Sequence, residues 1–141
     1  IFEGAQGLLL SQDRVWDMPH LTPSYCGMRN VRELMYEGSI DKIEPYYVTR
    51  SYMTRHGAGR MEREDPKMNL EDNTNRKNPW QGALRFGAVN WNTLMRRINI
   101  DHPNPKLVIT HCDQVPASVP FGDLHFHGPT RNDVEFRAKA A

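Results

Sequence analysis

An apolar run late in the chain ends in polar side chains that could bind a ligand. Residues 106–113 read KLVITHCD, a strand-length apolar segment followed by an imidazole, a thiol and a carboxylate. Open α/β sheets bind ligands at the carboxyl ends of their parallel strands. There the carboxylate of Asp113 could accept both N–H groups on the edge of a guanine base. The alternative is that Asp113 caps the backbone after the strand.

Two glycine turns also carry polar side chains. In EGAQG, Gln6 offers donors and an acceptor to the edge of a base, or else satisfies backbone groups of a tight turn. In TRHGAG, Arg55 and His56 precede Gly57, and such a loop lets main-chain groups approach a sugar or phosphate while arginine supplies charge. The alternative for the second turn is a solvated loop with a surface arginine.

A third polar stretch, NTNRKNPW, brings a hydroxyl, an amide and two cations together at Thr74, Asn75, Arg76 and Lys77. This set of groups suits a carboxylate or phosphate ligand. Flexible surface loops often have the same composition, so the sequence leaves both interpretations open.

Four residues are of types that bind zinc: His111, Cys112, His125 and His127. Alternation along a strand would place His125 and His127 on one face. Because the spacing of the four matches no zinc-finger or metalloprotease pattern, no metal ligand is assigned, and metal binding through the histidines stays as a further hypothesis. The chain also lacks the phosphate-cradling Gly-x-x-x-x-Gly-Lys-Ser/Thr loop and the Gly-x-Ser-x-Gly turn, so no catalytic centre of its own is expected.

Length and composition limit the class of protein. A chain of 141 residues suffices for one domain or for part of a larger one. A formal net charge of +1 gives no electrostatic reason to expect nucleic acid or membrane as a partner. No apolar run approaches the roughly 20 residues of a membrane span. Cys26 and Cys112 do not resemble a secreted disulfide framework, which favours a cytoplasmic location.

Hydrophobic periodicity predicts an α/β fold with long loops. The apolar run 106–113 is expected to be a parallel strand, and Val89, Leu94 and Ile98 lie close to helical spacing. The other expected elements are the end of a buried strand at 1–3, a short helix or turn at 8–10, a helix at 29–39 with Gly38 as its C-cap, a strand and loop at 43–60, a loop at 62–81, a helix over 86–101 and a short strand at 133–136.

Six stretches, in this order, resemble the adenylosuccinate synthetase family. FEGAQGLLL resembles the family's strand and turn that hold the nucleotide substrate, and MPHLTPS its proline-to-threonine stretch. YMTRHGAG is similar to its Thr-Arg-x-Gly-x-Gly loop, and QGALRFGAVNWNTLMRRIN to its Gly-x-Leu helix entry. LVITHCD resembles its guanine-specifying strand end, and HGPTR its final Gly-Pro-Asp-Arg turn. The resemblance spans residues 1 to about 136.

This resemblance implies both a fold and a reaction. The chain is expected to be the C-terminal part of a mostly parallel sheet with flanking helices and long ligand-binding loops, with residues 1–141 as a single C-terminal fragment. The family serves purine biosynthesis by joining IMP to L-aspartate, while GTP phosphorylates the purine 6-oxygen. Its phosphate loop, its catalytic Asp and His and most of its Mg²⁺ binding lie in the N-terminal half. The fragment alone is therefore expected to be inactive, and the full-length form a homodimer.

The resemblance also assigns roles to individual positions. It implies that the purine monophosphate contacts Gln6, Thr22, His56 and Gly57. It implies an aspartate-binding loop at Thr74, Asn75, Arg76 and Lys77. It implies contacts with the GTP base from His111, Asp113, Gly128 and Pro129. No catalytic residue and no metal ligand is assigned to this chain.

Several departures from the family's pattern leave the substrate open. The family's aspartate loop is Thr-Thr-Gly followed by arginines, whereas Lys77 stands in this loop, and lysine does not replace arginine in a bidentate carboxylate contact. His111 occupies the place of the lysine that stacks on guanine, and the segment between Asp113 and Gly128 is much shorter than in the family. Two alternatives therefore remain: a phage-type ligase acting on dGMP with an adenine nucleotide as donor, and a non-catalytic nucleotide-binding remnant.

Overall fold

The computed structural model describes residues 1–115 and 121–137. The chain divides into two compact units. The first consists of residues 1–45 and 91–105, and the second of residues 46–90 together with the described part of 106–141.

The first unit is helical. Its elements are the 3-10 helices η1 (Leu8–Leu10) and η2 (Val15–Asp17) and the α-helices α1 (Met28–Glu37) and α2 (Trp91–Asp101). Helix α2 lies against η1 and buries Leu94 and Ile98, which are four residues apart and therefore share one helix face. The short helix predicted at 8–10 and the helix predicted at 29–39 are confirmed. Gly38 is the C-cap of α1, and its N–H donates to the carbonyl of Leu34 at 2.9 Å.

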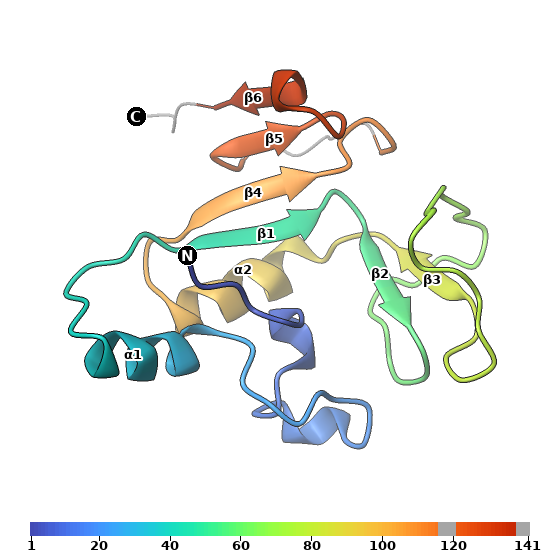
Figure 1. Ribbon diagram of the computed structural model, residues 1–141. Helices are drawn as coiled ribbons and strands as arrows, with labels where there is room; N and C mark the ends of the chain where they lie inside the picture. The colour runs from blue at the N-terminus through green and yellow to red at the C-terminus, as the bar shows by residue number, and fades with distance from the viewer. Residues whose placement is uncertain (116–120, 138–141) are drawn as a thin grey trace. The chain divides into compact units, whose positions relative to one another are not determined.

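The second unit contains a four-stranded sheet with the strand order β1-β4-β5-β6 (Figure 1). The strands are β1 (Tyr46–Arg50), β4 (Lys106–Thr110), β5 (Leu124–Phe126) and β6 (Val134–Phe136), the last preceded by the 3-10 helix η3 (Arg131–Asp133). Strands β1, β4 and β5 are parallel, and β6 runs antiparallel to β5. Because three of the four strands are parallel and helices occur in the same chain, the predicted α/β class with a mostly parallel sheet is confirmed.

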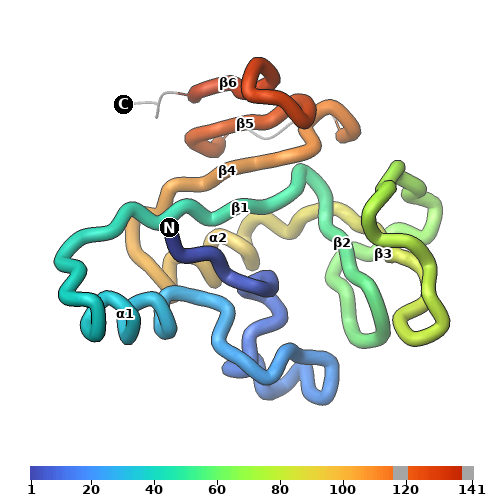
Figure 2. The backbone as a smooth tube through the Cα atoms, in the orientation of Figure 1, coloured from blue at the N-terminus to red at the C-terminus, as the bar shows by residue number. Residues whose placement is uncertain are grey.

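A two-stranded antiparallel sheet completes the second unit. It pairs β2 (Met53–His56) with β3 (Leu84–Gly87). Between these strands the chain forms the irregular loops drawn in green in Figure 2, which include the predicted loop 62–81. The connection from β1 to β4 therefore includes β2, β3 and α2.

Two predictions about the elements were wrong. Residues 1–3 form no strand, because none of the described residues pairs with them, and they are exposed. The helix predicted over 86–101 begins only at Trp91, because Phe86 pairs with Thr54 in the antiparallel sheet and is buried there. Val89 lies near helical spacing from Leu94 and Ile98 but is not in the helix; this buried residue lies between β3 and α2.

The remaining strand predictions are confirmed with shorter limits, and β5 was not predicted. The segment 43–60 contains both β1 and β2, and the strand predicted at 133–136 is β6. Both cysteines are free. Among the described residues, no helix has the length and apolar character needed to cross a membrane.

We expect Gly27→Ala to destabilise the first unit. The Asp101 carboxylate accepts hydrogen bonds from the N–H of Met28, the first residue of α1, at 2.9 and 3.2 Å. A Cβ atom on Gly27 would lie 2.3 Å from that carboxylate, so the carboxylate must move and the helix loses its cap. Loss of a cap costs about 1 kcal/mol in the free energy of unfolding, measurable by urea denaturation.

Gly7→Ala is the matched control for this substitution. Gly7 also precedes a helix with a negative φ, and a Cβ there would meet nothing within 4 Å. Equal stability of the two variants would contradict the role assigned to Asp101.

Candidate functional site

The carboxyl ends of the three parallel strands form the candidate site. Strands β1, β4 and β5 end at Arg50, Thr110 and Phe126, and their parallel pairing brings these ends to one edge of the sheet. We call the residues that follow them, 51–52, 111–114 and 127–129, the carboxyl edge. Ligands of open α/β sheets bind at this edge because the strands deliver loop side chains there.

Hydrogen bonds tie the three strand ends together. The Ser51 N–H donates to Thr110 O at 2.8 Å, and the Ser51 hydroxyl donates to His111 O at 2.8 Å. The Cys112 N–H donates to Phe126 O at 3.0 Å. The turn after β4 is therefore fastened to the residues after β1 and to the end of β5.

His111 reverses the chain at the end of β4. Its φ of 59° lies in the left-handed region, which allows the backbone to leave the direction of the strand. The ring lies edge-on to Tyr52, with ring centroids 5.7 Å apart, and its Nδ1 lies 2.9 Å from the Thr110 hydroxyl. Burial, helped by the nearby Arg50 guanidinium, lowers the pKa of His111 despite the opposing carboxylates, so the imidazole is neutral at pH 7.

A buried carboxylate organises the loop that approaches this edge. Asp72 accepts hydrogen bonds from the backbone N–H groups of Thr74 and Asn75 at 2.9 Å and from the Thr74 hydroxyl at 2.7 Å. The Asn75 amide donates to the same carboxylate at 2.9 Å, and Arg50, the last residue of β1, forms an ion pair with it at 2.8 Å. These contacts hold the loop 72–75 against the end of β1.

The charge of Asp72 is stabilised by its partners. Burial by itself would raise the pKa of this carboxyl group, but the hydrogen bonds from Asn75, Thr74 and Arg50 outweigh it. The net result is a pKa far below the ordinary value of an aspartate. Asp72 is therefore ionised throughout the physiological pH range.

Tyr52 connects the loop to the carboxyl edge. It is almost completely buried, and its hydroxyl donates to Gln114 Oε1 at 2.8 Å. The Gln114 amide in turn donates to Glu71 O at 3.1 Å. Burial is the main reason that the pKa of the Tyr52 hydroxyl is raised, so this group is a neutral donor in the network.

The structure brings several of the expected base-binding residues to the carboxyl edge. His111 and Asp113 follow β4, and Gly128 and Pro129 follow the neighbouring strand β5. Asp113 is exposed. A Cβ atom on Gly128 would lie 2.7 Å from Asp133 Oδ2. The turn at 128–129 therefore requires glycine for steric reasons, whatever it binds.

The four residues of the expected aspartate loop divide into two kinds. The polar groups of Thr74 and Asn75 are engaged with Asp72. Arg76 and Lys77 are exposed. The loop thus has an internal polar anchor followed by two cations that face solvent.

The four residues expected at the purine monophosphate lie in different units. Gln6 is exposed in the first unit, where Thr22 donates its N–H to Leu10 O at 2.9 Å. In the second unit His56 ends β2, with its Nε2 3.0 Å from Gly82 O, and Gly57 follows with a φ of 92°. That φ explains the glycine by backbone conformation alone.

Sequence reasoning missed the role of Arg85 and gave little weight to a metal site at the histidines. Arg85 on β3 donates to Gly57 O at 3.0 Å and to Gly59 O at 2.9 Å, and it forms an ion pair with Glu64, so it shapes the glycine loop. The ligand atoms of Cys112, His125 and His127 lie within 4.8 Å of one another, although the spacing of these residues had suggested no metal site. His111, the fourth candidate, is not part of that group.

A scan against protein-family models and a search of curated proteins find no match for this chain. The class that the fold itself defines is an α/β protein with a mostly parallel sheet, whose polar residues gather at the carboxyl ends of the strands.

We expect Asp72→Ala to lower the free energy of unfolding by roughly 2–3 kcal/mol, because it leaves Arg50 and the Asn75 amide without their acceptor. Urea denaturation of the variant measures this loss. Asp113→Ala is the control, since Asp113 is an exposed carboxylate of the same unit. Equal effects of the two substitutions would show that Asp72 does not organise the loop.

The contribution of Asp72 should also depend on pH. Its pKa is lower in the folded than in the unfolded chain, so the stabilisation is complete above the unfolded value of about 3.9 and is lost as the pH falls further. The stability difference between the wild type and Asp72→Ala should be constant from pH 7 to about 5 and shrink below about pH 4. Urea midpoints measured at each pH test this, and a difference that grows in acid would contradict it.

Proposed function

We propose that this chain is part of an adenylosuccinate synthetase-like ligase and that its carboxyl edge binds a purine nucleotide. The observation that carries the proposal is the exposed carboxylate of Asp113 in the turn after β4, together with the glycine–proline turn that follows the parallel neighbour β5. In the proposed complex the ligase joins IMP and L-aspartate and uses GTP as the phosphoryl donor.

The chemistry of guanine fits this edge. The base presents two neighbouring N–H donors, and an ionised carboxylate offers two acceptor oxygens that match them. Pro129 supplies an apolar surface without an N–H group next to the face of the base, and the neutral imidazole of His111 adds no charge there. Adenine lacks the paired donors, so Asp113 would favour GTP over ATP as the donor.

The loop after Asp72 fits an anionic substrate. Its backbone is held by the buried carboxylate, while Arg76 and Lys77 are exposed. In the proposed ligase these two cations contact the carboxylates of L-aspartate, and Gln6, Thr22, His56 and Gly57 contact the purine monophosphate. The catalytic Asp and His, and most Mg²⁺ ligands, belong to a part of the ligase outside these residues.

The exposed apolar face of β1 supports a role within a larger assembly. Tyr46 and Val48 alternate along this parallel strand and are 45% and 66% exposed. Parallel strands are normally covered on both faces. In the proposed ligase, further protein covers this face, the molecule is a homodimer and it works in the cytoplasm.

We expect Asp113→Asn to weaken GTP binding roughly 10–100-fold, because one of the two charged hydrogen bonds is replaced by an amide donor that faces a guanine donor. ATP binding should be unchanged. Xanthosine triphosphate should bind the variant better than the wild type, because its 2-oxo group accepts a hydrogen bond from the asparagine amide. Calorimetric titration of the protein in its full-length form, with Mg²⁺ present, measures all three affinities.

Asp41→Asn is the matched control, since Asp41 is an exposed aspartate of the first unit. Unchanged GTP affinity in Asp113→Asn would refute the role of Asp113. A wild type that binds dGMP and ATP in place of IMP and GTP would instead identify the phage-type ligase. Nucleotide binding without formation of adenylosuccinate would identify a non-catalytic remnant.

A further inference from the structure

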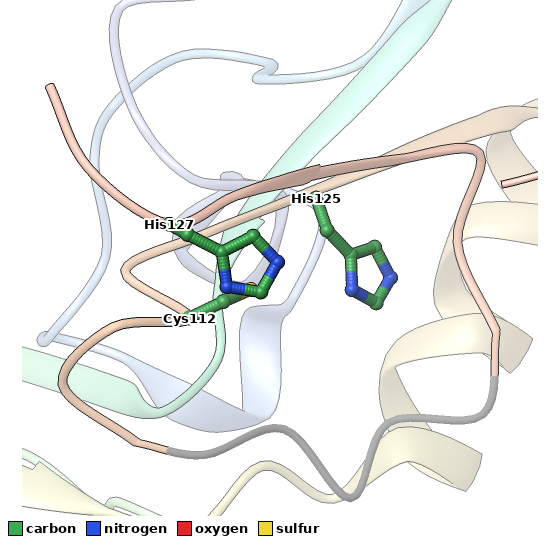
Figure 3. A group of neighbouring side chains, drawn as sticks. All are labelled: Cys112, His125 and His127. Carbon is green, nitrogen blue, oxygen red and sulfur yellow. The ribbon is translucent and has the colours of Figure 1, made fainter. Parts of the chain in front are cut away.

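One thiol and two imidazoles converge beside the carboxyl edge (Figure 3). Cys112 follows β4, His125 is the central residue of β5, and His127 follows β5 on the same face of the chain. The ligand atoms of the three side chains all lie within 4.8 Å of one another. Two adjacent parallel strands thus bring together residues that are 13 to 15 positions apart in the sequence.

His125 has a ring nitrogen whose hydrogen-bonding capacity is unused. The residue is completely buried, and its Nε2 lies 3.1 Å from Phe121 O, which can only accept, so Nε2 carries the proton. Its Nδ1 is buried, and none of the described residues forms a hydrogen bond with it. A buried polar atom left without a partner costs free energy, and an unprotonated ring nitrogen is a metal ligand.

The ring of His125 is also held in place sterically. Gly122 has a φ of 122°, and a Cβ at that position would lie 2.8 Å from His125 Nε2. The glycine turn therefore packs directly against the ring and leaves no room for a side chain. Together with the hydrogen bond to Phe121 O, this close packing fixes the orientation of the His125 ring and therefore the position of Nδ1.

His127 has the arrangement that metal-binding histidines commonly show. Its Nε2 lies 3.3 Å from Glu135 Oε2, on the neighbouring strand β6. In protein metal sites the nitrogen that does not bind the metal usually donates to a carboxylate or a backbone carbonyl, which fixes the orientation of the ring. Phe121 O holds Nε2 of His125 in this way, and Glu135 holds Nε2 of His127 in this way when Nδ1 of His127 is the metal ligand.

We propose that Cys112, His125 and His127 bind one Zn²⁺ ion. Thiolate sulfur and imidazole nitrogen are the ligands that zinc prefers, and in a tetrahedral site they lie roughly 3.3–3.6 Å apart. Binding would draw the three ligand atoms together from separations of up to 4.8 Å. His127 is 43% exposed, so the fourth position faces water, as in zinc sites with three protein ligands.

The proposed ion would join the ends of β4 and β5 at the carboxyl edge. It would stabilise the protein in proportion to its occupancy, because an ion that binds only the folded state shifts the unfolding equilibrium. The proposal does not depend on nucleotide binding, since none of the three ligands is a residue assigned above to the purine nucleotide or to L-aspartate.

The test is titration of the purified protein with Co²⁺, a spectroscopic substitute for Zn²⁺, with the thiols kept reduced. We expect one Co²⁺ per chain, with intense visible bands of tetrahedral geometry and a thiolate-to-cobalt charge-transfer band in the near ultraviolet. Zn²⁺ should displace the cobalt and raise the midpoint of thermal unfolding.

Variants identify the ligands. His127→Ala is at a partly exposed position, so the fold should survive, and the affinity for Co²⁺ should fall more than about 100-fold; Cys112→Ser should remove the charge-transfer band. Glu135→Gln, which alters the carboxylate partner of His127 and also its ion pair with Arg137, should weaken binding roughly 10-fold. His20→Ala and Cys26→Ser are the matched controls from the first unit and should bind as the wild type does.

Each remaining outcome overturns the proposal. These outcomes are no uptake of Co²⁺ or Zn²⁺ by the wild type, a bound ion without the charge-transfer band, unchanged affinity in folded His127→Ala, and binding of Cu²⁺ alone. Circular dichroism of every variant confirms that a lost ion does not reflect a lost fold.

Discussion

The parallel pairing of β1, β4 and β5 is the constraint on which the second unit depends. Parallel strands must end at the same edge, so residues far apart in sequence, such as Tyr52, Gln114 and His127, are delivered to one place. The buried apolar side chains of β4, with Ile109 completely enclosed, hold this register. Leu107, Val108 and Ile109 are consecutive and all buried, so both faces of β4 are covered, and the strand that leads to the site also forms the core.

The protonation states of the buried groups and the exposure of the charged groups determine which side chains of the carboxyl edge and the adjoining loop can contact a ligand. Asp72 remains ionised because Arg50 and the loop amides stabilise its charge, whereas burial keeps His111 and Tyr52 neutral. The result is a fixed ion pair of Asp72 and Arg50 with neutral groups around it, while Asp113, Arg76 and Lys77 are exposed. Buried groups shape the site, and exposed groups are the ones that can meet a ligand.

The two proposals use different parts of the same edge. The nucleotide proposal depends on exposed groups at the ends of β4 and β5. The zinc proposal depends on side chains directed between those strands, above all on the unsatisfied Nδ1 of His125. The two are physically compatible because the turn after β4 presents His111 toward Tyr52, while Cys112, the next residue, is buried beside His125 and His127.

The sequence by itself determined the α/β class, helix α1 with Gly38 at its end, and the strand that precedes Asp113, because these follow from local periodicity and turn chemistry. It did not reveal β5. Nor did it reveal the true start of α2, because cross-strand pairing overrides the helical spacing of the residues before Trp91. The sequence singled out neither Asp72 nor Arg85, because their importance comes from partners distant in the chain, Arg50 and Glu64. The spacing of His125 and His127 already predicted that they share a strand face, but only the tertiary structure brought Cys112 to them, because that proximity comes from the pairing of β4 with β5.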